Sequence, residues 1–181
     1  MAQRIVIAGM RRSGTHWQYN LVRLALEALA PGQVWAGQYD AYQFEAHPEP
    51  WHLVKIHRHW PRLAAGALVL TSFRALPEVQ ASHARMTGRW PRLQEVSTWM
   101  VDLLKWHRQA VHCTWYAHIV EEPAREAQRL LRALGLPARD AEALVQRVEA
   151  LRPPPGPPET QTRDPVTLLF QGHRTSQEPT P

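Results

Sequence analysis

The sequence has little cysteine, little lysine and no long apolar run. Its 181 residues include one cysteine, Cys113, and only two lysines, Lys55 and Lys105. A single cysteine excludes an internal disulfide, and no apolar run approaches the roughly 18 residues that a membrane-spanning helix needs. The N-terminal apolar run is too short for a signal peptide. We therefore expect a soluble, cytoplasmic protein with no membrane partner.

The charge is basic, and arginine supplies most of it. The formal net charge is +5 and the isoelectric point is about 10.0. Such a balance favours anionic partners without choosing among them. No lysine-rich run, zinc-ligand spacing or aromatic RNA-binding signature accompanies it, so we expect no nucleic acid partner.

An apolar strand, a glycine-bounded loop and an amphipathic helix follow one another near the start of the chain. The strand is predicted at 5–8, the loop lies between Gly9 and Gly14, and the helix is predicted at 15–30. In this order, backbone N–H groups and the positive end of the helix dipole converge on one anion. An ordinary glycine turn is the alternative interpretation.

The loop spacing is nearly that of a nucleotide-binding Walker A loop, with one difference. Thr15 and His16 stand where that loop has its lysine and its magnesium-binding hydroxyl. Arg11 and Arg12 supply cations earlier in the loop, and Ser13 and Thr15 supply hydroxyls. The pattern therefore predicts an anion site that works without a metal.

Two further strands end in residues that suit the same site. The second predicted strand, 53–57, places Lys55 and His57 on one face, because side chains alternate along a strand. His57 would lie near the carboxyl end of the strand, where ligands of open α/β sheets bind, and an imidazole can serve there as a general base. A structural or solvated histidine is the alternative.

The third predicted strand, 67–73, ends at Arg74. A helix over 77–86 follows and carries Ser82, eight residues after Arg74. These two side chains can meet on one phosphate, the guanidinium through a charge-assisted hydrogen bond and the hydroxyl as a donor. Without other context, they are a surface cation and a helix-face residue.

The remaining pattern continues the alternation of strands and helices. We expect an irregular aromatic segment over 33–52, a helix over 93–113, a strand over 116–120, and helices over about 121–134 and 138–151. Together these elements predict an α/β, three-layer P-loop-type fold with a central, mostly parallel sheet flanked by helices. We expect residues 1–152 to form this domain, 153–163 a proline-rich connector, 164–175 a segment docking on the domain and 176–181 a disordered tail.

These motifs together resemble the sulfotransferases that use 3′-phosphoadenosine-5′-phosphosulfate, PAPS. The family loop, typically Pro-Lys-Ser-Gly-Thr-x-Trp, is similar to residues 11–17, with Arg12 at the lysine position. Many members carry a Lys-x-His motif like residues 55–57, and their 3′-phosphate motif has the spacing of Arg74 and Ser82. Residues 116–137 are similar to a family stretch that passes through Glu-x-x-Pro into a helix ending Leu-Gly-Leu. The resemblance covers about residues 3–137, with weaker similarity over 164–175.

The resemblance implies a role for each motif residue. His57 would be the catalytic base, while Lys55 and Arg12 would stabilise charge developing during transfer. Arg74 and Ser82 would bind the 3′-phosphate, and Trp17 would stack on adenine. The 5′-phosphosulfate would be held by the loop residues Arg11, Arg12, Ser13, Gly14, Thr15, His16 and Trp17.

The resemblance also implies the substrates. PAPS would donate a sulfuryl group, without a metal, to a hydroxyl or amine of a small-molecule or carbohydrate acceptor. Residues 172–174 are the candidate segment that would close over the donor. Two other functions stay open: a nucleotide-dependent phosphotransferase with a degenerate P-loop, and a non-catalytic nucleotide-binding protein of the same fold. The oligomeric state is not set by the sequence.

Overall fold

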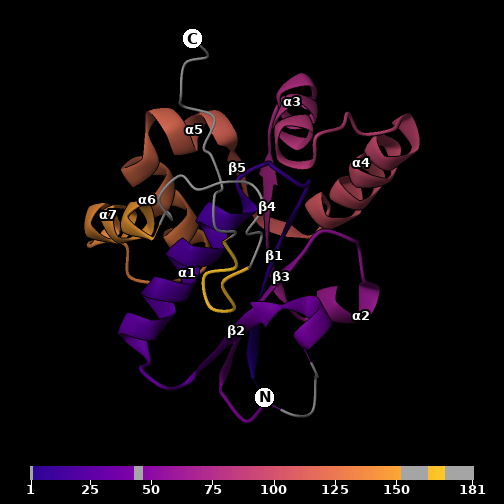
Figure 1. The fold of residues 1–181 in the computed structure, drawn as a ribbon. Helices are drawn as coiled ribbons and strands as arrows, with labels where there is room; N and C mark the ends of the chain where they lie inside the picture. Colours follow the sequence, from indigo (N-terminus) through magenta and orange to yellow (C-terminus); the bar gives the residue numbers. More distant parts are fainter. Residues whose placement is uncertain (1, 43–46, 152–162, 170–181) are drawn as a thin grey trace.

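The computed structural model describes residues 2–42, 47–151 and 163–169. Along these residues, strands alternate with helices (Figure 1). The strands are β1 (Gln3–Gly9), β2 (Val34–Gln38), β3 (Trp51–Ile56), β4 (Leu68–Phe73) and β5 (Ala110–Trp115). The helices are α1 (Thr15–Leu29), η1 (Tyr39–Ala41, a 3-10 helix), α2 (Pro61–Ala64), α3 (Leu76–Thr87), α4 (Leu93–His107), α5 (Tyr116–Glu121), α6 (Pro123–Ala133) and α7 (Ala141–Ala150).

The strands form one sheet in the order β2-β3-β1-β4-β5, and every pair is parallel. Parallel neighbours need crossover connections, and helices supply most of them here. Ala8 lies opposite Ile56, and Gly9 lies opposite Ser72. The carboxyl ends of β1, β3 and β4 therefore lie together at one edge of the sheet.

Helices cover both faces of the sheet, and the alternation of β1 determines which side chain meets which layer. Ile5 and Ile7 belong to the core formed with α1, α6 and α7, whereas Val6 and Ala8 belong to the core formed with α2 and α4. All four are fully buried, and each large one contributes about 1.5–3 kcal/mol by its removal from water. The predicted three-layer α/β fold with a parallel central sheet is thus confirmed.

The ends of α3 and α4 follow from local chemistry. Pro77 lies in the first turn of α3, where a backbone N–H has no partner within the helix, and Gly88 ends α3 with φ of 72°. At the start of α4, the Glu95 carboxylate accepts a hydrogen bond from the Arg92 N–H at 2.8 Å. The same carboxylate pairs with Arg89, so the connection between α3 and α4 is fixed to the helix that it precedes.

The expectation of an irregular segment over 33–52 is wrong for its first part. β2 pairs with β3 from Val34 opposite Trp51 to Gln38 opposite Lys55 and forms an edge of the sheet. This strand is short, includes Gly37 and has neither a buried apolar run nor a regular alternation. Its hydrogen bonds come from pairing with β3, which no local sequence pattern reveals.

The strand expected over 116–120 is also wrong. The helix expected over 93–113 begins at the predicted residue but ends before the predicted one. α4 ends at His107, β5 begins at Ala110, and residues 116–121 form α5. β5 is an edge strand with only one fully buried position, Thr114, so it lacks the apolar pattern of an inner strand. Ile119, read as a strand residue, instead packs from α5 into the main core.

Residues 163–169 lie against α1, although more than 130 residues separate them from α1 in the sequence. Tyr19 donates a hydrogen bond to the Val166 carbonyl at 3.2 Å, and Asn20 donates one to the Thr167 carbonyl at 2.9 Å. Leu168 is buried in the main core. Most of the expected connector, the candidate closing segment 172–174 and the expected tail lie outside the described residues.

No helix within the described ranges is both long enough and apolar enough to cross a bilayer.

Candidate functional site

Three strand ends bring the predicted site residues together. The phosphate loop, defined here as residues 9–14, joins β1 to α1, His57 follows β3, and Arg74 follows β4. Because these strands are neighbours and parallel, the three segments meet at one edge of the sheet. Ligands of open α/β sheets bind at this carboxyl edge.

The backbone of the phosphate loop requires glycine at both ends. Gly9 has φ of 155°, and a Cβ there would lie 2.8 Å from the Ser72 Oγ. Gly14 has φ of 103°, and a Cβ there would lie 2.5 Å from the Ile119 Cδ1. Gly14 also precedes α1 without a side-chain cap, and the first turn of α1 contains no acidic residue. The free N–H groups at this end of α1 therefore favour an anion.

Ser13 holds the loop in shape from inside. Its hydroxyl is fully buried and donates to the Met10 carbonyl at 2.6 Å. Since a hydroxyl has one proton, Ser72 donates to Ser13 in the 2.7 Å contact between the two oxygen atoms. The loop is thereby tied to β4, the strand that leads to Arg74.

Arg12 joins the loop to the predicted 3′-phosphate residues. Its Nε donates to the Ser82 Oγ at 3.0 Å, and its carbonyl accepts a hydrogen bond from the Arg74 Nη1 at 3.4 Å. Ser82 and Arg74 are 3% and 7% exposed. Burial and the charge of Arg74 lower the pKa of Arg12 to about 10. Two cations and a hydroxyl are thus held together on one side of the loop.

Arg74 is positioned by its neighbours in the phosphate loop, α3 and α5. Its Nε pairs with the exposed Glu78 carboxylate at 2.9 Å, and its guanidinium carbon lies 3.9 Å from the centre of the Tyr116 ring. A guanidinium over an aromatic face is attracted to it, so Tyr116 stabilises this orientation. Tyr116 was not predicted as a site residue, because the sequence pattern indicated a strand over 116–120.

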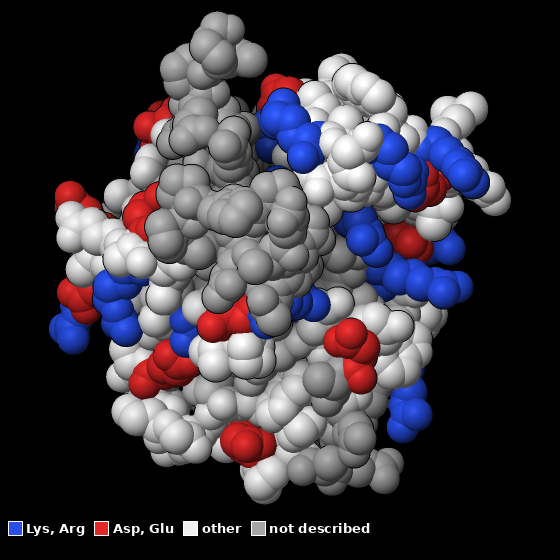
Figure 2. All heavy atoms as spheres, viewed as in Figure 1, with Lys and Arg blue, Asp and Glu red and all other residues white. Residues whose placement is uncertain are grey.

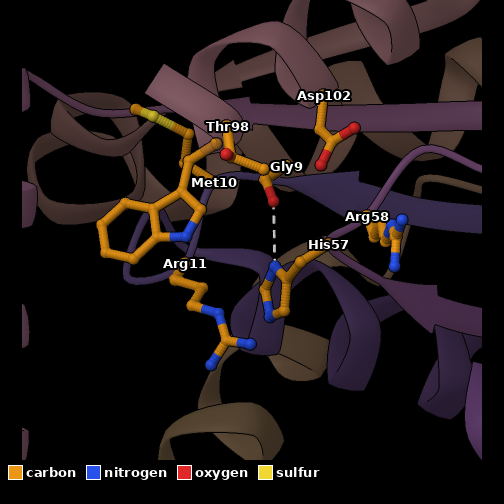
Figure 3. A pocket seen from close by; sticks show the side chains of 8 residues that line it. Gly9, Met10, Arg11, His57, Arg58, Thr98 and Asp102 are labelled. Carbon is orange, nitrogen blue, oxygen red and sulfur yellow. Dashed lines mark hydrogen bonds between the residues drawn. The ribbon is translucent and has the colours of Figure 1, made fainter. Parts of the chain in front are cut away.

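Lys55, His57 and the loop carbonyl of Gly9 form a chain of hydrogen bonds. The His57 Nδ1 lies 2.9 Å from the Gly9 carbonyl oxygen (Figure 3). The His57 Nε2 lies 3.3 Å from the Lys55 Nζ. A carbonyl only accepts, so Nδ1 carries the ring proton. Nε2 is then unprotonated and accepts from Lys55, which is the tautomer a general base needs.

Burial and crowded positive charge shift both pKa values downward. Lys55 is 2% exposed, and its pKa falls to about 7 because of burial and the nearby cations Arg163, Arg11 and Arg12. Burial and the charge of Lys55 lower the pKa of His57 well below its ordinary value. His57 is therefore neutral at neutral pH. A bound anion would relieve the repulsion among these cations.

The other predicted loop residues lie in different surroundings. Arg11 is exposed, Thr15 is buried at the start of α1, and His16 is partly exposed, with its carbonyl accepting a hydrogen bond from Asn20. Trp17 is 7% exposed and belongs to the main core. Most of its ring therefore packs against core residues.

Hollows lie beside the phosphate loop and beside Arg74. One, of about 160 Å³, is lined by residues that include Arg11, His57 and Asp102 (Figure 3). The other, of about 280 Å³, lies beside Arg74 and Tyr116. Among the described residues, no group of three or more His, Cys, Asp or Glu side chains is arranged to hold a metal ion.

Arg163 is a further cation that sequence analysis did not identify. It lies at the start of the segment docked on α1 and is the charge that lowers the pKa of Lys55 most. A single arginine after a proline-rich stretch carries no motif. Only the docking of residues 163–169 brings it near the site.

Comparison with known proteins gives a fold but no family. No protein-family model matches the chain, and no curated protein matches its sequence. The structure of retinol dehydratase with androsterone and the inactive cofactor PAP is similar, with a TM-score of 0.52 and 15% identity over 80% of this chain and 64% of that one. The complex of retinol dehydratase with retinol and PAP gives a TM-score of 0.53 at the same identity and coverage. The chain thus spans less than two thirds of the length of both structures, and the likeness shows a shared fold.

Proposed function

We propose that this chain is a sulfotransferase that moves the sulfuryl group of PAPS to a hydroxyl or amine of an acceptor. The hydrogen-bonded arrangement of Gly9, His57 and Lys55 carries the proposal, because it joins a neutral imidazole base to the phosphate loop. The structural neighbours support it, since both were crystallised with PAP, which PAPS becomes when it loses its sulfuryl group.

The charges of the site suit the donor. Arg12, Lys55 and Arg74 are largely buried around the loop, and both Arg12 and Lys55 have lowered pKa values. Buried cations of this kind are stabilised by a multiply charged anion. We propose that Arg74, Ser82 and Arg12 hold the 3′-phosphate and that the loop N–H groups hold the 5′-phosphosulfate.

The nucleoside has a candidate place beside Arg74. The hollow of about 280 Å³ there is lined by Trp115, Tyr116 and Val120 among other residues. Trp115 is half exposed, so its ring is available to a ligand, whereas Trp17 is largely enclosed by the core. We propose that the adenine lies in this hollow.

His57 acts as the general base in the proposed reaction. PAPS supplies an activated sulfuryl group: a bond forms between the acceptor atom and sulfur, the bond from sulfur to the 5′-phosphate oxygen breaks, and adenosine 3′,5′-bisphosphate leaves with the electron pair. His57 takes the acceptor proton on Nε2, while its Nδ1–H stays bonded to Gly9. The carbonyl of Gly9 fixes the ring orientation and stabilises the imidazolium that forms.

Lys55 changes partner in this mechanism. In the structure its Nζ donates to the His57 Nε2, the atom that must accept the acceptor proton. We propose that the bound anion attracts Lys55 and raises its pKa, which frees Nε2 and places a positive charge near the leaving phosphate oxygen. Fixed charges directed at the place where charge develops are a large source of catalysis.

A transfer assay with PAPS and a panel of alcohol, phenol, sugar and amine acceptors tests this proposal. His57→Ala is expected to lower kcat by roughly 10²–10⁴-fold, the usual contribution of a general base. It should keep its affinity for adenosine 3′,5′-bisphosphate. His107→Ala is the matched control, because His107 is exposed in the last turn of α4.

Three results would contradict the proposal. Undiminished transfer by His57→Ala would remove the assigned base. Bisphosphate binding without transfer to any acceptor would favour a non-catalytic nucleotide-binding protein. Magnesium-dependent ATP turnover would favour a phosphotransferase.

A further inference from the structure

The hollow of about 160 Å³ lies between the phosphate loop, the end of β3 and α4 (Figure 3). Gly9 and His57 line it from the sheet edge, and Thr98 and Asp102 line it from α4. Thr98 and Asp102 are four residues apart and therefore lie on one face of the helix. A molecule in this hollow would touch the imidazole that we assign as the base.

Three charged side chains around this hollow have no hydrogen-bond or ion-pair partner among the described residues. Arg11, Arg58 and Asp102 each line it, and none makes a hydrogen bond or an ion pair with another described residue. Other charges at the sheet edge are satisfied, as in the pair of Arg74 with Glu78. A carboxylate and two cations that line the same hollow can bind one ligand, because the carboxylate accepts hydrogen bonds from it and the cations donate to it.

The size and walls of the hollow select among acceptors. Pockets that enclose drug-sized apolar ligands usually measure about 300–1,000 Å³. A hollow of about 160 Å³ has room for roughly one sugar ring. Most of its exposed lining is apolar and includes Met10 and the partly exposed Trp99, whose ring centre lies 5.2 Å from that of His83. The polar part of the lining includes the charged side chains named above and Thr98. A polyhydroxylated ring with apolar C–H faces fits both kinds of wall.

We propose that the acceptor is a sugar unit, and that Asp102 accepts a hydrogen bond from a hydroxyl near the one that His57 deprotonates. This inference rests on the proposed sulfotransferase function. Asp102 thereby selects polyhydroxylated acceptors over apolar alcohols. Arg58 and Arg11 donate to other oxygen atoms of the same ring.

Binding is measured first, because it does not depend on turnover. The full chain is saturated with adenosine 3′,5′-bisphosphate, and saturation-transfer NMR is recorded with methyl glycosides of glucose, galactose and N-acetylglucosamine. Androsterone, retinol and 4-nitrophenol are measured in parallel. We expect a saturation-transfer signal, which reports binding, from at least one glycoside and none from the three apolar compounds. The bound bisphosphate is not expected to reduce the NMR signal of the glycoside, since the two ligands occupy separate sites.

The variant Asp102→Asn then tests the assigned contact. It keeps the shape of the side chain and is expected to raise the KM for the glycoside about 10–100-fold, the effect of losing one charge-assisted hydrogen bond. Affinity for the bisphosphate should stay unchanged. Glu142→Gln removes one exposed carboxylate from α7, away from the hollow, and is the matched control.

The outcomes separate this inference from the proposed function. Binding of the bisphosphate together with absence of signal from every glycoside overturns the inference alone. Sulfation of apolar alcohols with no effect of Asp102→Asn overturns it as well. Failure to bind the bisphosphate overturns the proposed function, and with it the inference.

Discussion

Lys55 is a side chain whose protonation depends strongly on its surroundings. Its pKa is about 7 in the folded protein, against an ordinary value of 10.5. Between these two pH values the unfolded chain holds a proton that the folded chain has lost, so the stability of the free protein rises with pH across this window. Below pH 7 the Lys55 amine is protonated in the folded protein as well, so the full free-energy penalty of burying the ammonium lowers the stability of the fold.

Replacing this buried cation is expected to stabilise the free protein. Lys55→Met should exceed the wild type in free energy of unfolding, and this advantage should be roughly 2–3 kcal/mol greater at pH 6 than at pH 9. Urea unfolding at both pH values measures it. The only other lysine, Lys105, is exposed on α4, so Lys105→Met is the control. Equal pH dependence in the two variants would show that Lys55 is not a buried, destabilised cation.

Ser82 is expected to distinguish nucleotides by their 3′-phosphate. Ser82→Ala removes the hydroxyl that accepts from the Arg12 Nε. We expect about tenfold weaker binding of adenosine 3′,5′-bisphosphate, the usual loss for a hydrogen bond to a charged group, and unchanged binding of adenosine 5′-monophosphate. Ser97→Ala, on the exposed face of α4, is the control. An equal loss of affinity for both nucleotides would show that Ser82 supports the phosphate loop and does not contact the 3′-phosphate.

The junction of the phosphate loop with α5 explains why the loop ends in glycine. Gly14 has positive φ, and Ile119 of α5 occupies the space that a side chain would need. α5 therefore packs directly against the end of the loop at Gly14. The same helix begins with Tyr116, which covers Arg74. One short helix thus supports both the loop and the predicted 3′-phosphate site.

A double-mutant cycle tests this junction. Gly14→Ala should destabilise the protein by about 1–2 kcal/mol through its backbone conformation and by a further 1–3 kcal/mol through overlap with Ile119. Gly32→Ala, with φ of 70° and open space around the new Cβ, shows the backbone effect alone. In an Ile119→Ala background, Gly14→Ala should destabilise the protein only by the backbone contribution, because the overlap with Ile119 is gone. Identical costs of Gly14→Ala in both backgrounds would exclude the overlap.

The inner strands and their motifs could be read from the sequence. β1, β3 and β4 are buried on both faces, so each is an apolar run whose end is marked by a polar residue. Lys55 and His57 could be placed on one face because strand alternation is local. Their 3.3 Å contact follows from that geometry.

The edge strands and long-range contacts could not be read in this way. β2 and β5 are partly exposed, and their residues lack an apolar pattern. Tyr116 was assigned to a strand because the turn from β5 into α5 has no glycine or proline signal. Arg163 comes near Lys55 only through the docking of a distant segment on α1.

The molecule as a whole is suited to anionic ligands. Figure 2 shows Lys and Arg gathered on the side of α3 and α4, where Arg85, Arg89 and Arg92 are exposed. With a net charge of +5, this distribution attracts anions toward the edge that carries the phosphate loop. Part of this attraction is screened by salt, so we expect weaker nucleotide binding as ionic strength rises.

Calorimetry with adenosine 3′,5′-bisphosphate and with ATP–magnesium tests the central claim most directly. We predict that the bisphosphate binds in the presence of EDTA and more tightly than ATP–magnesium. At pH 8 its binding heat should differ between Tris and HEPES in the sense of proton uptake, because the anion raises the pKa of Lys55 from about 7. Tighter binding of ATP–magnesium, with no bisphosphate binding in EDTA, would contradict the assignment of the loop as a site for PAPS.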